Sequence, residues 1–165
     1  MAELKKMLVV RPENCTACRL CELACSLAKT GTFNPTESRI QVHLFLDEPF
    51  FVPLVCMQCT DAPCENVCPT AALKRNGETA VVEFTREKCI GCKTCMMACP
   101  FGVMNFSSRN GHVFKCDNCQ GDPECVKFCV FDALDYREAE LSMAAKRAAF
   151  ARQLREAQRT RAASP

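Results

Sequence analysis

The sequence predicts a small α+β protein in which one structural unit is duplicated, and two observations support this prediction. The first is that sixteen cysteines among 165 residues fall into four groups of four. The second is that the connections between groups are short apolar stretches that flank turn signals such as Asn76-Gly77 and Asn110-Gly111. Such stretches predict β-hairpins. The chain length favours one compact domain.

The cysteine spacing is nearly the same in all four groups. Each group starts with Cys-x2-Cys and ends with Cys-x3-Cys, and only the gap in the middle varies between two and five residues. We call these groups the four runs, in chain order: Cys15, Cys18, Cys21 and Cys25; Cys56, Cys59, Cys64 and Cys68; Cys89, Cys92, Cys95 and Cys99; Cys116, Cys119, Cys125 and Cys129.

This spacing is typical of iron–sulfur ligand runs. Two runs place three cysteines in a loop of seven residues, with a fourth four positions later. A [4Fe–4S] cubane takes four thiolates, so the sixteen cysteines predict four [4Fe–4S] clusters and are themselves the predicted metal ligands. Zinc sites instead pair two Cys-x2-Cys units across a loop of about 15 residues. A disulfide framework is the other alternative, but it is expected in small secreted proteins, and this sequence shows no export signal.

The runs are predicted to work in pairs, because the fourth cysteine of a run binds the other cluster in two-cluster ferredoxins. The second and third runs both end in Cys-Pro and form the natural inner pair, whereas the first and fourth lack this proline. Spacing alone also permits a sequential pairing, first with second and third with fourth. The inner–outer pairing predicts four ligand sets, here called quartets: Cys15, Cys18, Cys21 and Cys129 (quartet 1); Cys25, Cys116, Cys119 and Cys125 (quartet 2); Cys56, Cys59, Cys64 and Cys99 (quartet 3); Cys68, Cys89, Cys92 and Cys95 (quartet 4).

The predicted fold is therefore a duplicated bacterial ferredoxin-like fold within residues 1–136. An inner unit of about residues 50–110 is nested in an outer unit formed by residues 1–49 and 111–136. Strands are expected at residues 7–11 and 39–46, hairpins at 72–84 and 103–114, and a short helix at 93–98. Cluster binding supplies much of the folding free energy in such proteins, so the protein without clusters is expected to be largely unfolded.

The C-terminal segment, residues 137–165, is predicted to be a basic helix and tail. Residues 137–162 contain no Gly or Pro and carry seven Lys or Arg against three Asp or Glu. Their Ala-, Arg- and Glu-rich composition favours a helix. The helix either packs on its own protein or docks on a partner subunit.

Several functional classes are disfavoured by what the sequence lacks. The formal charge of +2 is too small to argue for nucleic acid binding. There is no apolar run of about 18 residues and no signal-peptide core, so we expect no membrane span and a cytoplasmic protein. No Gly-rich nucleotide motif occurs. The two histidines, His43 and His112, are interpreted as surface or packing residues, and no catalytic residue is predicted.

Most of the sequence, residues 7–135, resembles the dimethyl sulfoxide reductase iron–sulfur subunit family, the four-cluster ferredoxin subunits of molybdenum and tungsten oxidoreductases. The similar segments are LVVRPENC (8–15), CENVCPTAAL (64–73) and CIGCKTCMMACPFG (89–102). The resemblance implies the nested pairing. The sequence departs from the family at Ala17 and Ala71, where Gly is usual, and at Val130, where Pro is usual.

The fourth run suggests a narrower resemblance. Its compact form, KCDNCQGDPECVKFC (115–129), is followed by a basic segment. This arrangement is similar to the small subunits of tungsten-dependent aldehyde oxidoreductase complexes. The ferredoxin subunits of carbon monoxide dehydrogenase, hydrogenase and formate dehydrogenase complexes are similar too.

Together these observations predict a non-catalytic electron-transfer subunit within a hetero-oligomer. Two partners are expected. One is a catalytic subunit, which would be a tungsten or molybdenum pterin enzyme, and the other is a flavoprotein or another electron acceptor. Stacking of subunits into longer electron wires stays open. The alternative from another class is an interaction or assembly protein in which the clusters are structural.

Overall fold

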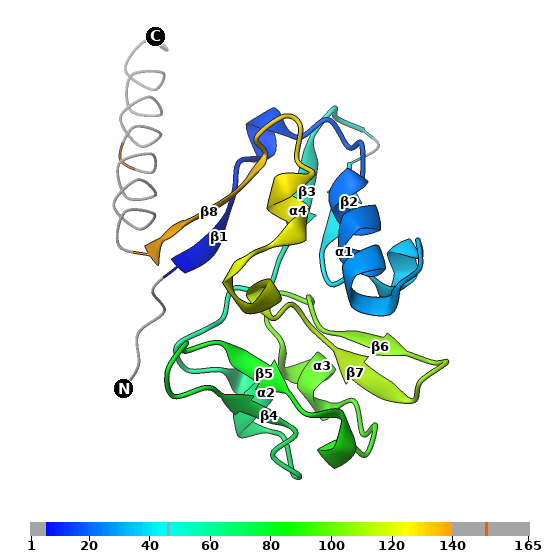
Figure 1. The fold of residues 1–165 in the computed structure, drawn as a ribbon, viewed down its shortest axis with the longest axis vertical. Coiled ribbons are helices and arrows are strands. Elements are labelled where there is room, and N and C mark those ends of the chain that lie inside the picture. The colour runs from blue at the N-terminus through cyan, green and yellow to red at the C-terminus, as the bar shows by residue number, and fades with distance from the viewer. Residues whose placement is uncertain (1–5, 46, 140–150, 152–165) are drawn as a thin grey trace, which may run out of the picture.

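The computed structural model describes residues 6–45, 47–139 and 151 (Figure 1). Its helices are α1 (Leu20–Thr30), α2 (Pro63–Asn66), α3 (Thr94–Ala98) and α4 (Glu124–Lys127). Short 3-10 helices occupy Pro12–Asn14, Pro35–Glu37, Arg86–Lys88 and Asn118–Gly121. The strands are β1 (Lys6–Val10), β2 (Gln41–Leu44), β3 (Phe51–Leu54), β4 (Leu73–Arg75), β5 (Val82–Phe84), β6 (Asn105–Ser107), β7 (His112–Phe114) and β8 (Leu134–Glu138).

The strands of the described residues form four antiparallel pairs. Strand β1 pairs with β8, so that Lys6 lies opposite Glu138 and Val10 opposite Leu134. The other pairs, β2–β3, β4–β5 and β6–β7, join neighbouring strands as hairpins. A two-stranded hairpin is marginally stable on its own in water, so these pairs need other groups to pack against.

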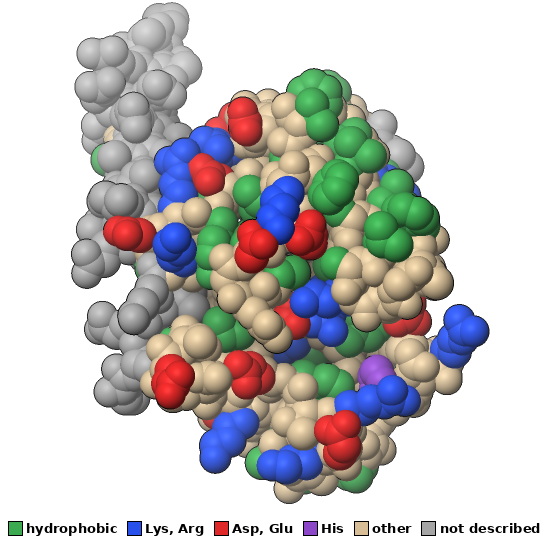
Figure 2. Space-filling view, viewed as in Figure 1, with side chains coloured by type: hydrophobic (Ala, Val, Ile, Leu, Met, Phe, Trp, Pro, Cys, Tyr) green, Lys and Arg blue, Asp and Glu red, His purple; other side chains and the backbone are tan. Residues whose placement is uncertain are grey.

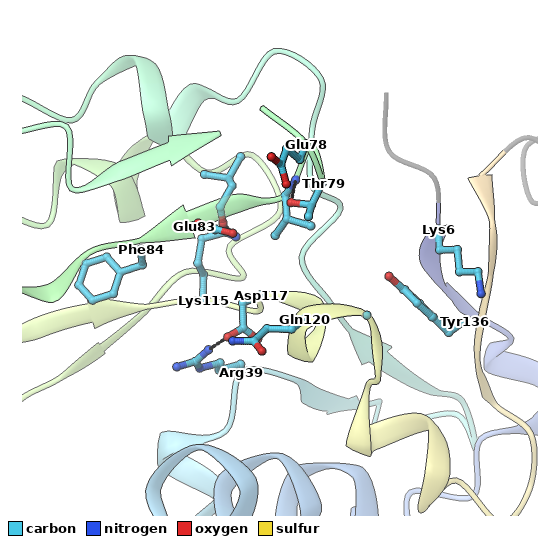
Figure 3. Close-up of a pocket in the computed structure, with 13 residues that line it drawn as sticks. Lys6, Arg39, Glu78, Thr79, Glu83, Phe84, Lys115, Asp117, Gln120 and Tyr136 are labelled. Carbon is cyan, nitrogen blue, oxygen red and sulfur yellow. Dashed lines mark hydrogen bonds and ion pairs between the residues drawn. The ribbon is translucent and has the colours of Figure 1, made fainter. Parts of the chain in front are cut away.

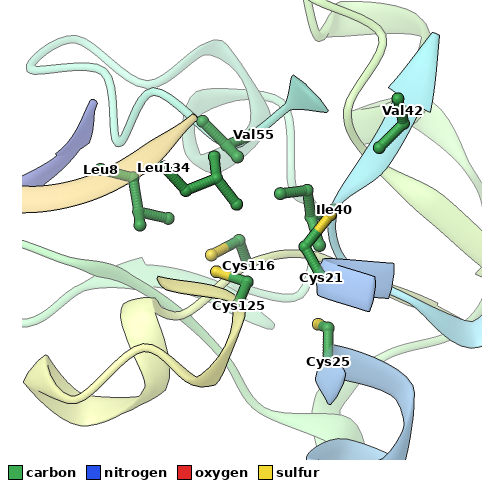
Figure 4. Close-up of a cluster of buried hydrophobic side chains, with 9 residues drawn as sticks. All are labelled: Leu8, Cys21, Cys25, Ile40, Val42, Val55, Cys116, Cys125 and Leu134. Carbon is green, nitrogen blue, oxygen red and sulfur yellow. The ribbon is translucent and has the colours of Figure 1, made fainter. Parts of the chain in front are cut away.

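The elements gather into two lobes (Figure 1). The first lobe holds β1, β8, β2, β3, α1 and α4, and the second holds β4 to β7 with α2 and α3. Each lobe has its own apolar core. Figure 4 shows the first core, where the sulfur atoms of Cys21, Cys25, Cys116 and Cys125 lie among aliphatic side chains including Ile40 and Leu134. The architecture is thus a mixture of short helices and small sheets, consistent with a ferredoxin-type domain.

Both predicted hairpins and the predicted short helix occur in the structure. The turn between β4 and β5 is wider than a two-residue Asn-Gly turn. The Asn76 side-chain oxygen accepts hydrogen bonds from the backbone N–H groups of Glu78 and Thr79, and Asn76 N–H bonds to the carbonyl of Val81 at 2.9 Å. The side chain of Asn76 therefore shapes a six-residue loop, as Asn does in many turns.

Two predicted elements differ in the structure. The strand expected at 39–46 is restricted to Gln41–Leu44, and its alternating burial stops at Leu44, which is exposed. The helix expected from residue 137 does not start there, because β8 continues to Glu138 and pairs with β1. The rest of that predicted helix lies outside the described residues, except for residues 139 and 151.

Helix α1 was not expected from the sequence, and it positions the cysteines of the first run. It begins after Arg19, which has a left-handed φ of 59°, and ends at Gly31, whose φ of 72° caps the helix. The buried carboxylate of Glu22 accepts hydrogen bonds from Arg19 Nε (2.7 Å) and from the backbone N–H of Val42 (2.7 Å). Helix α1 and strand β2 are therefore joined by a buried carboxylate.

Candidate iron–sulfur sites

Three hollows in the structure are each surrounded by four cysteines that come from two different runs. Their empty volumes are similar, about 320, 400 and 320 Å³, which fits groups of one kind. Phe128 and Phe131 line the first hollow, and Phe101 lines the second. The cysteines around them are Cys15, Cys18, Cys21 and Cys129; Cys56, Cys59, Cys64 and Cys99; Cys68, Cys89, Cys92 and Cys95.

Of the remaining four cysteines, Cys25, Cys116 and Cys125 lie in the core of the first lobe together with Cys21 of quartet 1, and Cys119 is partly buried. Burial raises the pKa of Cys125, and the neighbouring charges of Cys116, Cys25 and Cys119 raise it further. The structure thus groups twelve of the sixteen cysteines as in quartets 1, 3 and 4, and it places three members of quartet 2 in one core. That each group binds one cluster stays a prediction.

The backbone at the cysteine loops repeats one unusual conformation. The second residue after the first cysteine of each run has a positive φ: Ala17 at 57°, Gln58 at 49°, Gly91 at 69° and Asn118 at 55°. A left-handed residue in such a loop turns successive N–H groups toward one point, a nest that binds anionic groups and occurs at many iron–sulfur sites. Only one of these positions is Gly, so three loops hold a strained backbone, at about 1–2 kcal/mol each.

Burial also affects the protonation of the thiols. Burial, more than any other cause, raises the pKa of Cys21 and of Cys116 to about 12 and that of Cys95 to about 11. Iron binds the thiolate form of cysteine. Cluster binding therefore deprotonates thiols that would otherwise be neutral at pH 7 and releases their protons.

Backbone N–H groups point at several of the ligand sulfurs. Arg39 N–H donates to Cys25 Sγ at 3.3 Å, Ala72 N–H to Cys68 Sγ at 3.2 Å and Asn118 N–H to Cys116 Sγ at 3.4 Å. Hydrogen bonds of this kind orient a metal ligand and help to set the reduction potential of a cluster.

One buried donor indicates that another group belongs next to quartet 2. The side-chain nitrogen Nδ2 of Asn118 is buried and has no acceptor among the described residues. Asn118 lies between the ligand cysteines Cys116 and Cys119, and a cluster sulfur would supply the missing acceptor. The residues present therefore fit an iron–sulfur cluster at this position.

The cysteine groups are more widely spread than the ligands of a single ion. Within residues 6–45 and 47–139, no three Cys, His, Asp or Glu side chains are close enough to hold one metal ion. The thiolates of a cubane bind four different irons, so they surround a larger volume.

Phenylalanine side chains only partly shield the cysteine hollows from water. Phe101, Phe128 and Phe131 line the hollows but remain about half exposed. Phe45 and Phe50 instead pack on each other in the β2–β3 hairpin, with ring centroids 5.8 Å apart. Figure 2 shows hydrophobic side chains gathered on the first lobe.

Both histidines lie away from the cysteine hollows, in agreement with their interpretation as surface or packing residues. His43 is exposed on β2, and its ring packs against that of Phe45 in a T-shaped arrangement with centroids 4.8 Å apart. His112 is partly buried on β7, with its ring 5.6 Å from that of Phe84.

The buried polar residues beside the quartets were not expected from the sequence. Gln58, Lys115 and Asn118 are all less than 5% exposed. The available signal was their position, because each lies next to a ligand cysteine or between two of them. In the part of the sequence that the structure describes, no helix has the length and apolar character needed to cross a membrane.

Comparison with known proteins identifies the family. A family model described as a 4Fe-4S dicluster domain matches residues 48–139, and one described as a 4Fe-4S binding domain matches residues 12–31. The polyferredoxin-like subunit of an aliphatic sulfonate oxidoreductase from Pyrococcus furiosus is 44% identical over 123 residues, which is 74% of this chain and 70% of the relative.

Two further relatives support the same family assignment. The putative electron transport protein YsaA of Escherichia coli is 35% identical, over 83% of this chain and 92% of its own length. A subunit of the anaerobic dimethyl sulfoxide reductase from Haemophilus influenzae is 32% identical, over 75% of this chain and 69% of its own length. The protein therefore belongs to the [4Fe–4S] dicluster-domain family, and it is an iron–sulfur electron-transfer subunit that binds multiple [4Fe–4S] clusters.

Proposed function

We propose that the four quartets each bind one [4Fe–4S] cluster and that the protein relays electrons between a catalytic oxidoreductase subunit and an acceptor. When bound, each cubane takes up and releases one electron. The observation that carries the proposal is that cysteines from two different runs line each of three separate hollows. Runs two and three share the second and third hollows, and runs one and four share the first, as expected for an inner ferredoxin unit nested in an outer one.

The apolar cores support a linear order, because the first core contains cysteines of quartets 1 and 2 together with Cys56 of quartet 3, and the second contains cysteines of quartets 3 and 4. Cys21 of quartet 1 contributes to the raised pKa of Cys125 in quartet 2. In the same way Cys56 of quartet 3 acts on Cys116 of quartet 2, and Cys64 of quartet 3 acts on Cys95 of quartet 4. The order that follows is 1–2–3–4.

Exposure suggests where electrons enter and leave. Cys18 of quartet 1 and Cys92 of quartet 4 are exposed, whereas quartet 2 has three buried members, Cys25, Cys116 and Cys125. The ends of the proposed order are therefore the two places where a partner's redox centre can approach closely. All sixteen cysteines are free of disulfides, which suits a reducing compartment such as the cytoplasm.

For the catalytic partner we propose a tungsten-dependent aldehyde oxidoreductase, with a flavoprotein as the acceptor. The support is the compact fourth run, in which only five residues separate Cys119 from Cys125. The relative from Pyrococcus furiosus is named as a subunit of an aliphatic sulfonate oxidoreductase, so an enzyme of that kind is the second candidate. Purification of the native complex, with assays for tungsten, molybdenum and flavin, tests the choice; a complex without tungsten rules out the first candidate.

Ligand substitutions test the quartets. Protein prepared without oxygen should contain about 16 irons per molecule, since each cubane holds four. The nested pairing places Cys25 with Cys116, so Cys25→Ser and Cys116→Ser should alter the same EPR signal. A sequential pairing would instead make Cys25→Ser match Cys64→Ser. Clusters that cannot be reduced reversibly would favour the structural alternative.

A further inference from the structure

Lys115 places a cation in the interior of the protein, between the two lobes. The residue follows β7 directly and is only 3% exposed. Its Nζ donates to the carbonyl of Val82 on β5 (2.5 Å), to the carbonyl of Cys116 (2.7 Å) and to Oε1 of Gln58 (3.3 Å). An ammonium group has three N–H donors, and here three oxygens accept them.

Gln58 completes this arrangement and fixes the position of the ammonium group. The Gln58 side chain is 4% exposed, and its Nε2 donates to the same Cys116 carbonyl at 2.9 Å. Its Oε1 also accepts from the backbone N–H of Val82 at 3.1 Å. Each side-chain polar atom of Lys115 and Gln58 thus has a partner, and a fully bonded buried network of this kind is rigid.

The charge of Lys115 has no carboxylate partner among the described residues. The oxygens that accept from its Nζ are all uncharged amide oxygens, and every ion pair within that part of the sequence is made by other residues. A buried cation costs several kcal/mol unless an opposite charge is near. A negatively charged group beside Lys115 would offset this cost.

The ligand thiolates of two quartets lie where that negative charge is needed. Lys115 lines the same hollow as the four cysteines of quartet 3. It is also the residue directly before Cys116 of quartet 2. Burial raises the pKa of both Cys64 and Cys116, and the charge of Lys115 opposes this rise at each. The ammonium group therefore acts on quartets 2 and 3 and lies at the junction of the two lobes.

We infer that the buried ammonium group of Lys115 raises the reduction potentials of the clusters at quartets 2 and 3, in the middle of the proposed order. This inference rests on the proposed binding of clusters by these quartets. Reduction adds one electron from a low-potential donor to a cluster and makes its net charge more negative by one. A fixed positive charge nearby stabilises the reduced form more than the oxidised form. The electron comes from the donor, and no bond is made or broken in this step.

The test is an anaerobic redox titration of the full-length protein with dithionite, followed by EPR and combined with iron analysis. Lys115→Met retains a long, unbranched side chain and removes the charge. The expected result is a full iron content and a fall in the midpoint potentials of two clusters, on the order of 59 mV each, which is a tenfold change in a one-electron equilibrium. Lys115→Arg keeps the positive charge, so the midpoint potentials of these clusters should stay at their wild-type values. Lys74→Met removes an exposed charge on β4 and should leave all four potentials unchanged.

A second variant covers the case in which Lys115→Met does not hold its clusters. Gln58→Glu keeps the oxygen that accepts from Lys115 and places a negative charge against the ammonium group, so it should lower the same potentials. Unchanged potentials at full iron content would overturn the inference, as would an equal shift of all four clusters. If Lys115→Met and Gln58→Glu both lose iron while Lys115→Arg keeps it, the role of Lys115 is to hold the two lobes together. That result would also overturn the inference. Failure of the wild-type protein to bind four clusters would instead contradict the proposed function.

Discussion

Asp117 and Arg39 connect the loop of the fourth run to the segment that follows the first. Arg39 Nη1 donates to Asp117 Oδ2 at 2.6 Å (Figure 3). The backbone N–H of Arg39 donates to Cys25 Sγ at 3.3 Å. Lys29 from α1 adds a second cation, with Nζ 2.9 Å from Asp117 Oδ1. A single carboxylate therefore holds together the two parts of the sequence that contribute to quartet 2.

Replacing this carboxylate should destabilise the protein. Burial alone would raise the pKa of Asp117, but Arg39 and Lys29 outweigh it and hold the pKa below its usual value. We expect Asp117→Asn to lower the free energy of unfolding by about 1–3 kcal/mol, because two partly buried cations lose the negative charge and one of the two acceptor oxygens of their partner. Denaturant unfolding followed by cluster absorbance measures the loss. Because the folded pKa is depressed, the contribution is complete above about pH 5 and declines as the solution is acidified.

The matched control for this variant is Asp122→Asn. Asp122 pairs with Lys127, and its side chain is 75% exposed. Exposed pairs contribute about 0–1 kcal/mol, so this change should matter little. Equal effects of the two substitutions would mean that the Asp117–Arg39 pair has no special role.

Gly91 is the position in the third run that tolerates no side chain. A Cβ atom added there would lie 2.7 Å from the carbonyl oxygen of Gly111, in the turn between β6 and β7. Gly91→Ala should therefore cost roughly 2 kcal/mol or more, through backbone strain at positive φ together with overpacking. Thermal loss of cluster absorbance provides the measurement.

Gly102→Ala separates the two contributions to the Gly91 effect. Gly102 also has a positive φ, 62°, but a Cβ atom there would meet nothing within 4 Å. We expect this variant to lose only the strain energy of about 1–2 kcal/mol. If it loses as much as Gly91→Ala, the contact with Gly111 is unimportant.

The buried amide of Asn118 is expected to donate to a cluster sulfur at quartet 2. Asn118→Asp keeps the size of the side chain, removes the Nδ2 donor and adds negative charge, and both changes disfavour the reduced cluster. One midpoint potential should fall, on the order of 59 mV or a tenfold change in the equilibrium constant. Asn110→Asp adds the same charge at an exposed turn and serves as the control in the EPR titration. Equal potentials in wild type and Asn118→Asp would show that the amide has another partner.

Removal of iron should unfold the protein. The strand pairs of the described residues have two strands each, and several ligand thiols belong to the apolar cores themselves. Cluster binding is therefore coupled to folding. Treatment with an oxidant and a chelator should abolish both the visible absorbance and the dispersed amide signals in NMR spectra. A colourless protein with native dispersion would contradict this expectation.

Cysteine spacing and turn signals predicted the local structure around the sites well, because this structure is determined by residues that are close together in the sequence. The short helix α3 and the hairpins β4–β5 and β6–β7 follow from such local signals. Helix α1 was missed because its buried side includes Cys21 and Cys25, which were counted as ligands and not as part of an amphipathic pattern. The continuation of β8 to Glu138 was missed because β1, its partner, lies at the other end of the sequence.

The polar contacts beside the sites could not be predicted for a different reason. Gln58 and Lys115 lie 57 positions apart, and their hydrogen bond exists only after the two lobes have come together. Arg39 and Asp117 lie 78 positions apart. Neither residue type nor spacing reveals such a pair in one sequence, whereas a ligand run reveals itself within about fifteen residues.

The pairing of β1 with β8 also affects the order of events during biosynthesis. Val10 lies opposite Leu134, so β1 leaves the ribosome long before β8 and has no partner until the residues between them have been made. At 5–20 residues per second, this delay is roughly 6–25 s. During that time the thiols of the first run lack the cysteines of the fourth run, so they stay open to oxidation for longer than those of the second and third runs, which are neighbours in the sequence.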